Sequence, residues 1–166
     1  MLEKLKELCK HYQTKFSFGS TSAIITNLAL IVGLYPSTNA RTSIIGGILV
    51  IALADNISDS LGIHIYQESE RIEQKEVWLS TITNFMARLL VSLVFIAFLL
   101  FLPMKTAAIC SFVWGFLLLS VISYFIARNK DINPFMAIFE HVMIAVVVIL
   151  ASNYVGKLLT GFVSAH

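Results

Sequence analysis

Charged residues are scarce in this sequence. They make up 13% of its 166 residues, whereas hydrophobic residues make up 57%. A typical soluble domain has roughly 25% charged and 45–50% apolar residues. A chain of this size cannot hide so much apolar surface in one small core. The composition therefore predicts an all-α integral membrane protein, with membrane lipid as its main surroundings.

Other missing features exclude several classes of protein. The net charge is only +2 and the basic residues are not clustered, so no nucleic-acid partner is expected. Cys9 and Cys110 lie far apart without metal-type spacing, so neither a disulfide nor a tightly bound cofactor is expected. No Ser/His arrangement and no His-Glu-x-x-His motif is present, which argues against an enzyme. Residues 1–15 are charged and lack a cleavage site, so no signal peptide is expected.

Five apolar stretches predict five transmembrane helices, because each approaches the roughly 20 residues that cross a bilayer. They cover about residues 18–35, 41–66, 79–102, 106–127 and 134–159, and the first is the shortest. Residues 1–16 are predicted to form an amphipathic helix on the membrane surface, because apolar residues recur there at helical spacing between lysines. The chain thus divides into this N-terminal helix, residues 1–16, and a single transmembrane domain, residues 17–166.

Lysine and arginine predict the orientation of these spans. Five spans place the two chain ends on opposite sides of the membrane, and positive charge is enriched on the cytoplasmic side. Eight such residues fall on the side of the N-terminus and three on the other, so the N-terminus is predicted to be cytoplasmic. The eight are Lys4, Lys6, Lys10, Lys15, Arg71, Lys75, Arg128 and Lys130, and the three are Arg41, Lys105 and Lys157.

The second span carries two carboxylates where lipid is expected. Asp55 and Asp59 are four residues apart, so a helix places them about 40° apart on one face. Ionisable groups within a bilayer usually face a cavity, a partner or an ion path, and two like charges need a cation or a proton between them. We therefore predict that Asp55 and Asp59 bind a cation, with Ser58, Ser22 and Asn27 as further oxygen ligands.

The helix that carries these carboxylates is predicted to continue into water. No helix-breaking residue lies between Tyr66 and Trp78, so the second span is expected to run on to Trp78 as one rod. Its polar face then extends from the carboxylates through Tyr66 to Glu73. Tyr66, Glu70 and Glu73 are accordingly predicted to line a path for protons or cations.

Two further ionisable residues leave alternatives open. His64 lies about 180° round the helix from Asp55, so it either handles protons on the same path or packs against another helix. Arg88 lies inside the third span and needs a partner there. Either Asp55 or Asp59 forms an ion pair with Arg88, or the long side chain reaches the cytoplasmic headgroups.

Three stretches carry a family pattern. The second span contains Asn56-Ile57-Ser58-Asp59-Ser60-Leu61-Gly62-Ile63-His64, similar to a small-Ile-Ser-x-x-Leu-Gly-x-Tyr pattern, followed by a Ser- and Glu/Arg-rich tail at residues 67–71. The first span opens on Gly19-Ser20-Thr21-Ser22-Ala23-Ile24 and closes on Ala29-Leu30-Ile31-Val32-Gly33. Together with residues 153–159, these stretches resemble the vacuolar iron transporter family over nearly the whole chain.

The resemblance implies a homodimer that moves Fe²⁺ or Mn²⁺ out of the cytoplasm in exchange for protons. The chain departs from the family at three places. Ser22 stands where the family has Asp, Asp59 stands where a Met is expected, and only the short acidic run of residues 68–76 replaces a metal-binding insert. A carboxylate in place of a thioether favours harder cations such as Mn²⁺, Mg²⁺ or Ca²⁺.

Two other functions stay open at this point. The chain could be a non-transporting membrane protein of the same fold, in which the carboxylates pair with Arg88, or a carrier of organic solutes. A homodimer is also favoured by size, because five short spans are too few to enclose a path. Gly46, Gly47 and Gly62 would permit the close helix contact that a dimer needs.

Overall fold

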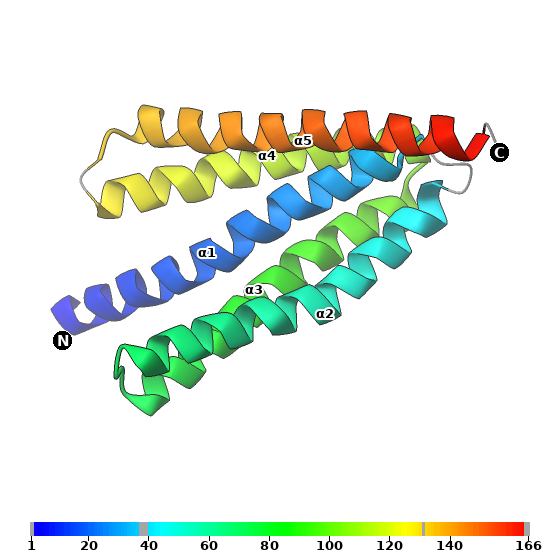
Figure 1. The fold of residues 1–166 in the computed structure, drawn as a ribbon. Coiled ribbons are helices and arrows are strands. Elements are labelled where there is room, and N and C mark those ends of the chain that lie inside the picture. Colours follow the sequence, from blue (N-terminus) through cyan, green and yellow to red (C-terminus); the bar gives the residue numbers. More distant parts are fainter. Residues whose placement is uncertain (1, 37–39, 131, 165–166) are drawn as a thin grey trace.

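The computed structural model describes residues 2–36, 40–130 and 132–164, and the side chains among them except those of residues 2–16, 18, 163 and 164. The described residues form five helices joined by short connections (Figure 1). They are α1 (Leu2–Leu34), α2 (Ala40–Ser69), α3 (Gln74–Phe101), α4 (Met104–Asn129) and α5 (Pro134–Ser164). The all-α expectation is confirmed.

Four of these helices are long and apolar enough to cross a membrane. They are α2, α3, α4 and the part of α5 from Pro134 to Phe162. The apolar stretch of α1 that is described, Gly19–Leu34, is shorter than a full span. The prediction of an integral membrane protein therefore holds, and the fifth crossing stays a prediction. The free ends of α1 and α5 lie at opposite ends of the bundle, as an odd number of crossings requires (Figure 1).

Helix α1 is the central element of the bundle. It packs against α2, α3, α4 and α5, and it runs between the α2–α3 pair and the α4–α5 pair (Figure 1). Its buried apolar side chains include Ile24, Leu28 and Ile31, which meet Phe95 and Leu99 of α3 in the main core. This core is confined to the inside of the bundle, so each outer helix buries only one face.

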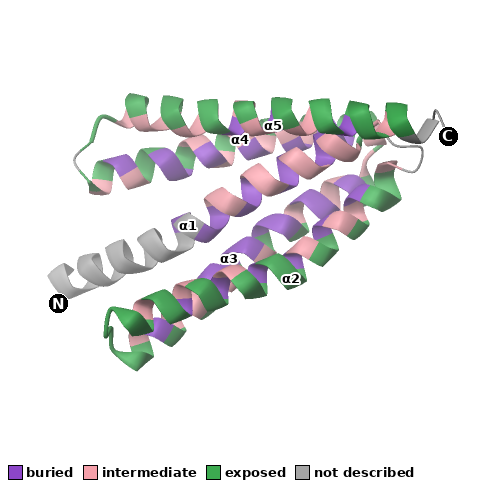
Figure 2. Cartoon of the chain, viewed as in Figure 1, coloured by how far each residue is buried: buried purple, intermediate pink, exposed green. Residues whose placement is uncertain are grey.

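The outward faces of the bundle are apolar as well. Large hydrophobic side chains are exposed on α2 to α5, for example Leu53, Leu90, Val113 and Val147. Figure 2 shows that exposed residues run along the outside of α5 over the part of the helix whose side chains are described. A soluble protein rarely exposes so much contiguous apolar surface. Lipid contact is the simplest account of these faces.

Helix α1 shows no break at residue 16. Its backbone is one continuous helix from Leu2 to Leu34, although residues 1–16 were expected to form a separate amphipathic helix. The side chains of residues 2–16 lie outside the described part, so the amphipathic character and the boundary between residues 16 and 17 stay predictions. Because the helix is continuous, residues 2–16 extend along the same axis as the apolar stretch Gly19–Leu34.

The prediction that α2 continues to Trp78 as one rod is wrong. Helix α2 ends at Ser69, and α3 begins at Gln74. Arg71 has a φ of 57°. Its N–H donates a hydrogen bond to the Glu68 carbonyl oxygen, and the Ile72 N–H donates one to the Gln67 carbonyl oxygen. These two bonds form a Schellman motif, the common way to end a helix on a left-handed residue. The sequence does not reveal this helix end, because the left-handed position of a Schellman motif is usually a glycine and here it is Arg71.

One glycine pair allows α1 and α5 to approach each other closely. A Cβ built on Gly156 of α5 would lie 1.9 Å from the Gly33 carbonyl oxygen of α1, so the two backbones touch there. By contrast, a Cβ on Gly46 or Gly62 would meet nothing within 4 Å among the described residues, and one on Gly47 would make ordinary contacts. Gly46 and Gly62 therefore do not serve helix packing within one chain.

Replacing Arg71 by Gly is expected to stabilise the protein. The left-handed conformation costs a non-glycine residue free energy, and glycine removes that cost at the price of more unfolded-state entropy. We expect Arg71→Gly to raise the free energy of unfolding by about 0.5 kcal/mol, measured by denaturant unfolding in detergent. Arg71→Ala removes the same side chain but keeps the strained φ, so it is expected to give no gain. An equal gain in both variants would contradict this account.

Replacing Gly156 by Ala is expected to destabilise the protein strongly. Its Cβ would overlap the Gly33 backbone, which cannot move without separating α1 from α5. We expect a loss of about 3 kcal/mol or more, because overpacking against backbone has no cheap relief. Gly161→Ala, on the same helix with nothing within 4 Å, is the matched control and should be neutral or slightly stabilising. Thermal unfolding in detergent measures both, and equal melting temperatures would refute the contact.

Candidate functional site

Arg88 is the centre of the most polar cluster inside the bundle. Its side chain is only 1% exposed, although it carries a full positive charge. The guanidinium forms ion pairs with Asp55 and Asp59 of α2. Its Nε donates to Asn56 Oδ1 at 2.6 Å, and Nη1 donates to Ser22 Oγ of α1 at 2.8 Å. Three helices therefore meet at one cation, and the ion pair that the sequence left open is present with both carboxylates.

The cluster lies near the middle of the helices that form it. Asp55 is about 22 Å from the start of α2, which is about 45 Å long at 1.5 Å per residue. Arg88 is likewise near the midpoint of α3. Unlike Arg88, the carboxylates are half exposed, Asp55 at 48% and Asp59 at 41%. The cluster thus has a buried cationic side and an open anionic side.

Its charges do not cancel when both carboxylates are ionised. One guanidinium then faces two carboxylates, so the cluster is one positive charge short. An uncompensated charge in the middle of a membrane is costly, and such groups recruit a cation, a proton or water. The open carboxylate side is where a further positive charge could enter.

A row of buried polar residues extends from this cluster along α3. Ser80, Asn84, Arg88 and Ser92 recur every four residues on one face, and each is at most 3% exposed. Ser92 accepts from Asn27 of α1, Asn84 donates to Ser60 of α2, and Ser80 accepts from Gln67 of α2. Interhelical bonds of this kind join spans in a lipid environment, where apolar attraction between helices is weak.

His64 lies on the buried side of α2, away from the carboxylate face. Its Nδ1 is 3.0 Å from Thr81 Oγ1, and the Thr81 hydroxyl donates to the Val77 carbonyl oxygen at 2.8 Å. Nε2 lies 3.4 Å from Glu68 Oε1, and the ring packs edge-on against Trp78. The structure therefore places His64 in the α2–α3 contact rather than beside Asp55.

The other predicted path residues do not form one line. Tyr66 is exposed on α2, and Glu70 follows the end of that helix. Glu73 stands at the N-cap position of α3, so it does not continue the Asp55 face as expected. That expectation is wrong because the chain reverses at Arg71, which also ended the predicted continuous helix from α2 to Trp78. Glu70 and Glu73 lie at the tip of the α2–α3 hairpin instead.

Of the three predicted oxygen ligands, only Ser22 reaches the cluster. Ser22 accepts from Arg88, whereas Ser58 is exposed on α2 and Asn27 donates to Ser92 one turn farther along α3. Among the described residues, no group of three or more His, Cys, Asp or Glu side chains is close enough to hold a metal ion. Arg88 holds the Oδ2 atom of each carboxylate, so a cation that used both oxygens of Asp55 or Asp59 would have to displace the guanidinium from that residue.

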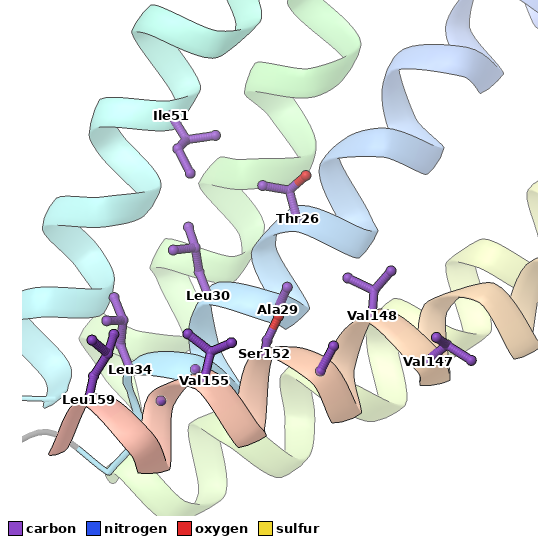
Figure 3. Close-up of a pocket in the computed structure, with 13 residues that line it drawn as sticks. Thr26, Ala29, Leu30, Leu34, Ile51, Val147, Val148, Ser152, Val155 and Leu159 are labelled. Atoms are coloured by element: carbon purple, nitrogen blue, oxygen red, sulfur yellow. The ribbon is translucent and has the colours of Figure 1, made fainter. Parts of the chain in front are cut away.

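A cavity of about 530 Å³ begins one helical turn from the cluster, between α1, α2 and α5. Thr26, four residues after Ser22 on α1, and Ile51, four residues before Asp55 on α2, both line it. Figure 3 shows that the remaining wall consists mainly of aliphatic side chains of α1 and α5, such as Leu30 and Val155. This cavity therefore offers a cation few ligands beyond the hydroxyls of Thr26 and Ser152.

Sequence reasoning missed Asn56 as a ligand of Arg88 and Asn84 as a neighbour of it. A signal for both was present, because polar residues recur every four positions at 56, 60 and 64 and again at 80, 84, 88 and 92. Two antiparallel helices with that spacing place polar residues opposite each other. Comparison with known proteins adds nothing to this picture: no family model, no curated protein and no solved structure matches the chain.

Removing both carboxylates is expected to destabilise the fold through Arg88. Asp55→Asn or Asp59→Asn alone leaves one carboxylate on the guanidinium, so each should cost little. The double variant leaves a buried cation without any counter-charge, and we expect it to lose about 3–5 kcal/mol of unfolding free energy. Adding Arg88→Met to the double variant should restore most of that loss. Denaturant unfolding in detergent measures all four, and simple additivity of the single changes would contradict the pairing.

Proposed function

We propose that this chain transports a divalent metal cation, Fe²⁺ or Mn²⁺, out of the cytoplasm, and that Asp55 and Asp59 bind it on the way. The observation that carries the proposal is the half-exposed carboxylate pair at the middle of a membrane-length helix. Lipid is a poor environment for that pair. Its open side must face water, a cargo ion or another protein surface, and the first two describe a transport path.

Arg88 gives the carboxylates a counter-charge while no cargo is present. In this proposal the divalent cation enters on the open side and takes both oxygens of each carboxylate, so it displaces Arg88 from the Oδ2 atoms. The cost of that release weakens cation affinity. Weak binding suits a transporter, because an ion held only by carboxylates without competition would be slow to leave. In this proposal the guanidinium limits residence time rather than blocking the site.

The sequence motifs supply the direction and the cargo. The patterns at residues 56–64 and 19–33 resemble the vacuolar iron transporter family, which implies export of Fe²⁺ or Mn²⁺, exchange with protons and a homodimer. We include all three in the proposal. A second copy that packed against α2 near Gly62, where a Cβ would meet nothing within 4 Å among the described residues, would also shield the exposed carboxylates from lipid, because Gly62 lies about 20° round the helix from Asp55.

One observation favours the alternative of a non-transporting membrane protein. Arg88 already bonds both carboxylates, Asn56 and Ser22, so the cluster is well connected without cargo. A purely structural cluster would also join three helices at one point. The two functions differ in what they require of the second negative charge, because one carboxylate is enough to pair Arg88 but not to bind a divalent ion beside it.

Metal flux into liposomes tests the proposal. We expect the wild-type protein to move Mn²⁺ or Fe²⁺, and Asp55→Asn and Asp59→Asn to lose most of that flux while staying folded, since one carboxylate still pairs Arg88. Glu140→Gln removes an exposed carboxylate at the start of α5, outside the cluster, and should transport normally. Folded single variants with undiminished flux, or a wild-type protein that moves neither metal, would favour the structural role. A pH-sensitive dye inside the liposomes reports proton exchange in the same experiment.

A further inference from the structure

We propose that Asn84 Oδ1 is a second acceptor for the Arg88 guanidinium, used when a cation occupies Asp55 and Asp59. This inference rests on the proposed function, because it explains where Arg88 goes when cargo arrives. A guanidinium that is 1% exposed cannot simply be released into an apolar interior. It needs other acceptors within reach, and these must be free in the cargo-free protein.

Asn84 has such a free acceptor. Its Nδ2 donates to Ser60 Oγ at 3.1 Å, but its Oδ1 is buried and has no hydrogen-bond partner among the described residues. A buried polar atom without a partner is unfavourable, and native structures contain few of them. This one carries two unused lone pairs on an oxygen of the kind that already holds Arg88 at Asn56.

The position of Asn84 fits the reach of Arg88. Asn84 precedes Arg88 by four residues on the same buried face of α3, and long side chains on a helix point back toward that position. The point where a Cβ on Gly19 would stand is 2.7 Å from Asn84 Oδ1 and 3.1 Å from Arg88 Cγ, so both atoms lie against the same glycine of α1. Rotation about the outer bonds of Arg88 can therefore carry the guanidinium toward Asn84 without moving the backbone.

The neutral acceptors make this shift small. Asn56 Oδ1 and Ser22 Oγ already bond Arg88 and carry no charge, so a cation does not compete for them in the way that it competes for the carboxylates. With Asn84 as a third acceptor, the guanidinium keeps neutral partners while both carboxylates turn to the cargo. The cation and Arg88 then occupy opposite sides of the cluster, which limits their mutual repulsion.

Mn²⁺ titration of the purified full chain in detergent, followed by the electron paramagnetic resonance of free Mn²⁺, tests this role. We expect Asn84→Leu to weaken Mn²⁺ binding about tenfold, because Arg88 loses its alternative acceptor. Ser60→Ala is the matched control, since it removes the same Asn84–Ser60 bond but keeps Oδ1, and it should bind Mn²⁺ within about twofold of wild type. Asn84→Asp restores an acceptor oxygen and should bind at least as tightly as wild type. Equal affinity in wild type and Asn84→Leu would overturn the inference.

A second measurement separates this inference from the proposed function. In the Asp59→Asn background the guanidinium has lost one carboxylate, so Asn84→Leu should lower the melting temperature more than it does in wild type, whereas Ser60→Ala should have the same effect in both. That pattern in a protein that binds no Mn²⁺ would support the second acceptor and reject the metal cargo. If the protein binds Mn²⁺ but Asn84→Leu lowers the melting temperature equally in both backgrounds, the metal cargo is supported and the second acceptor is rejected.

Discussion

The ion pairs of Arg88 are the interaction on which the rest of this structure depends. A guanidinium cannot remain uncompensated inside a lipid-embedded bundle, so α2 must present its carboxylates to α3, and α1 must bring Ser22 to the same point. These requirements fix the rotation of α2 about its axis. The apolar residues Leu53, Ile57 and Leu61 then face outward, where lipid can accept them. One buried charge thus sets both the polar interior and the apolar exterior of this helix.

The same constraint explains why the polar groups are arranged unevenly. Arg88 and Asn56 are buried and Ser22 is partly buried, whereas the two carboxylates are half exposed, so the cluster has one closed and one open side. A cluster that served only to hold helices together would gain most from burying all its members. The open side is therefore the feature that separates a site from a simple helix contact, and it is the reason that we favour a transported cation.

Much of the fold could be predicted from the sequence because membrane helices follow from hydrophobic length alone. The predicted end of the third helix at Pro103 and the predicted start of the fifth at Pro134 lie close to the observed helix limits. Proline marks a helix boundary through its own backbone, whatever the tertiary contacts. The reversal at Arg71 could not be predicted in this way. Its left-handed residue is an arginine rather than a glycine, and the conformation is held by contacts of the following helix with α2.

The site shows a similar division. Asp55 and Asp59 could be singled out because a carboxylate in an apolar run is conspicuous, and Arg88 for the same reason. Their meeting could be offered only as one of two possibilities, because pairing depends on the rotation of α3 relative to α2. Asn56 and Asn84 were overlooked because an amide in a long helix has no marked signature by itself. Only the shared spacing of four residues on both helices connects them to the cluster.

The contact between Gly33 and Gly156 has a mechanical consequence. Two backbones in contact at one point cannot come closer there, so a change in the crossing angle would turn α1 about that point. Gly19 lies 14 positions before Gly33, about 21 Å along the helix. A tilt of α1 by about 10° about that point would move Gly19 by about 4 Å along its arc. Because Gly19 lies against Arg88 Cγ, a tilt of this size would change the space beside Arg88.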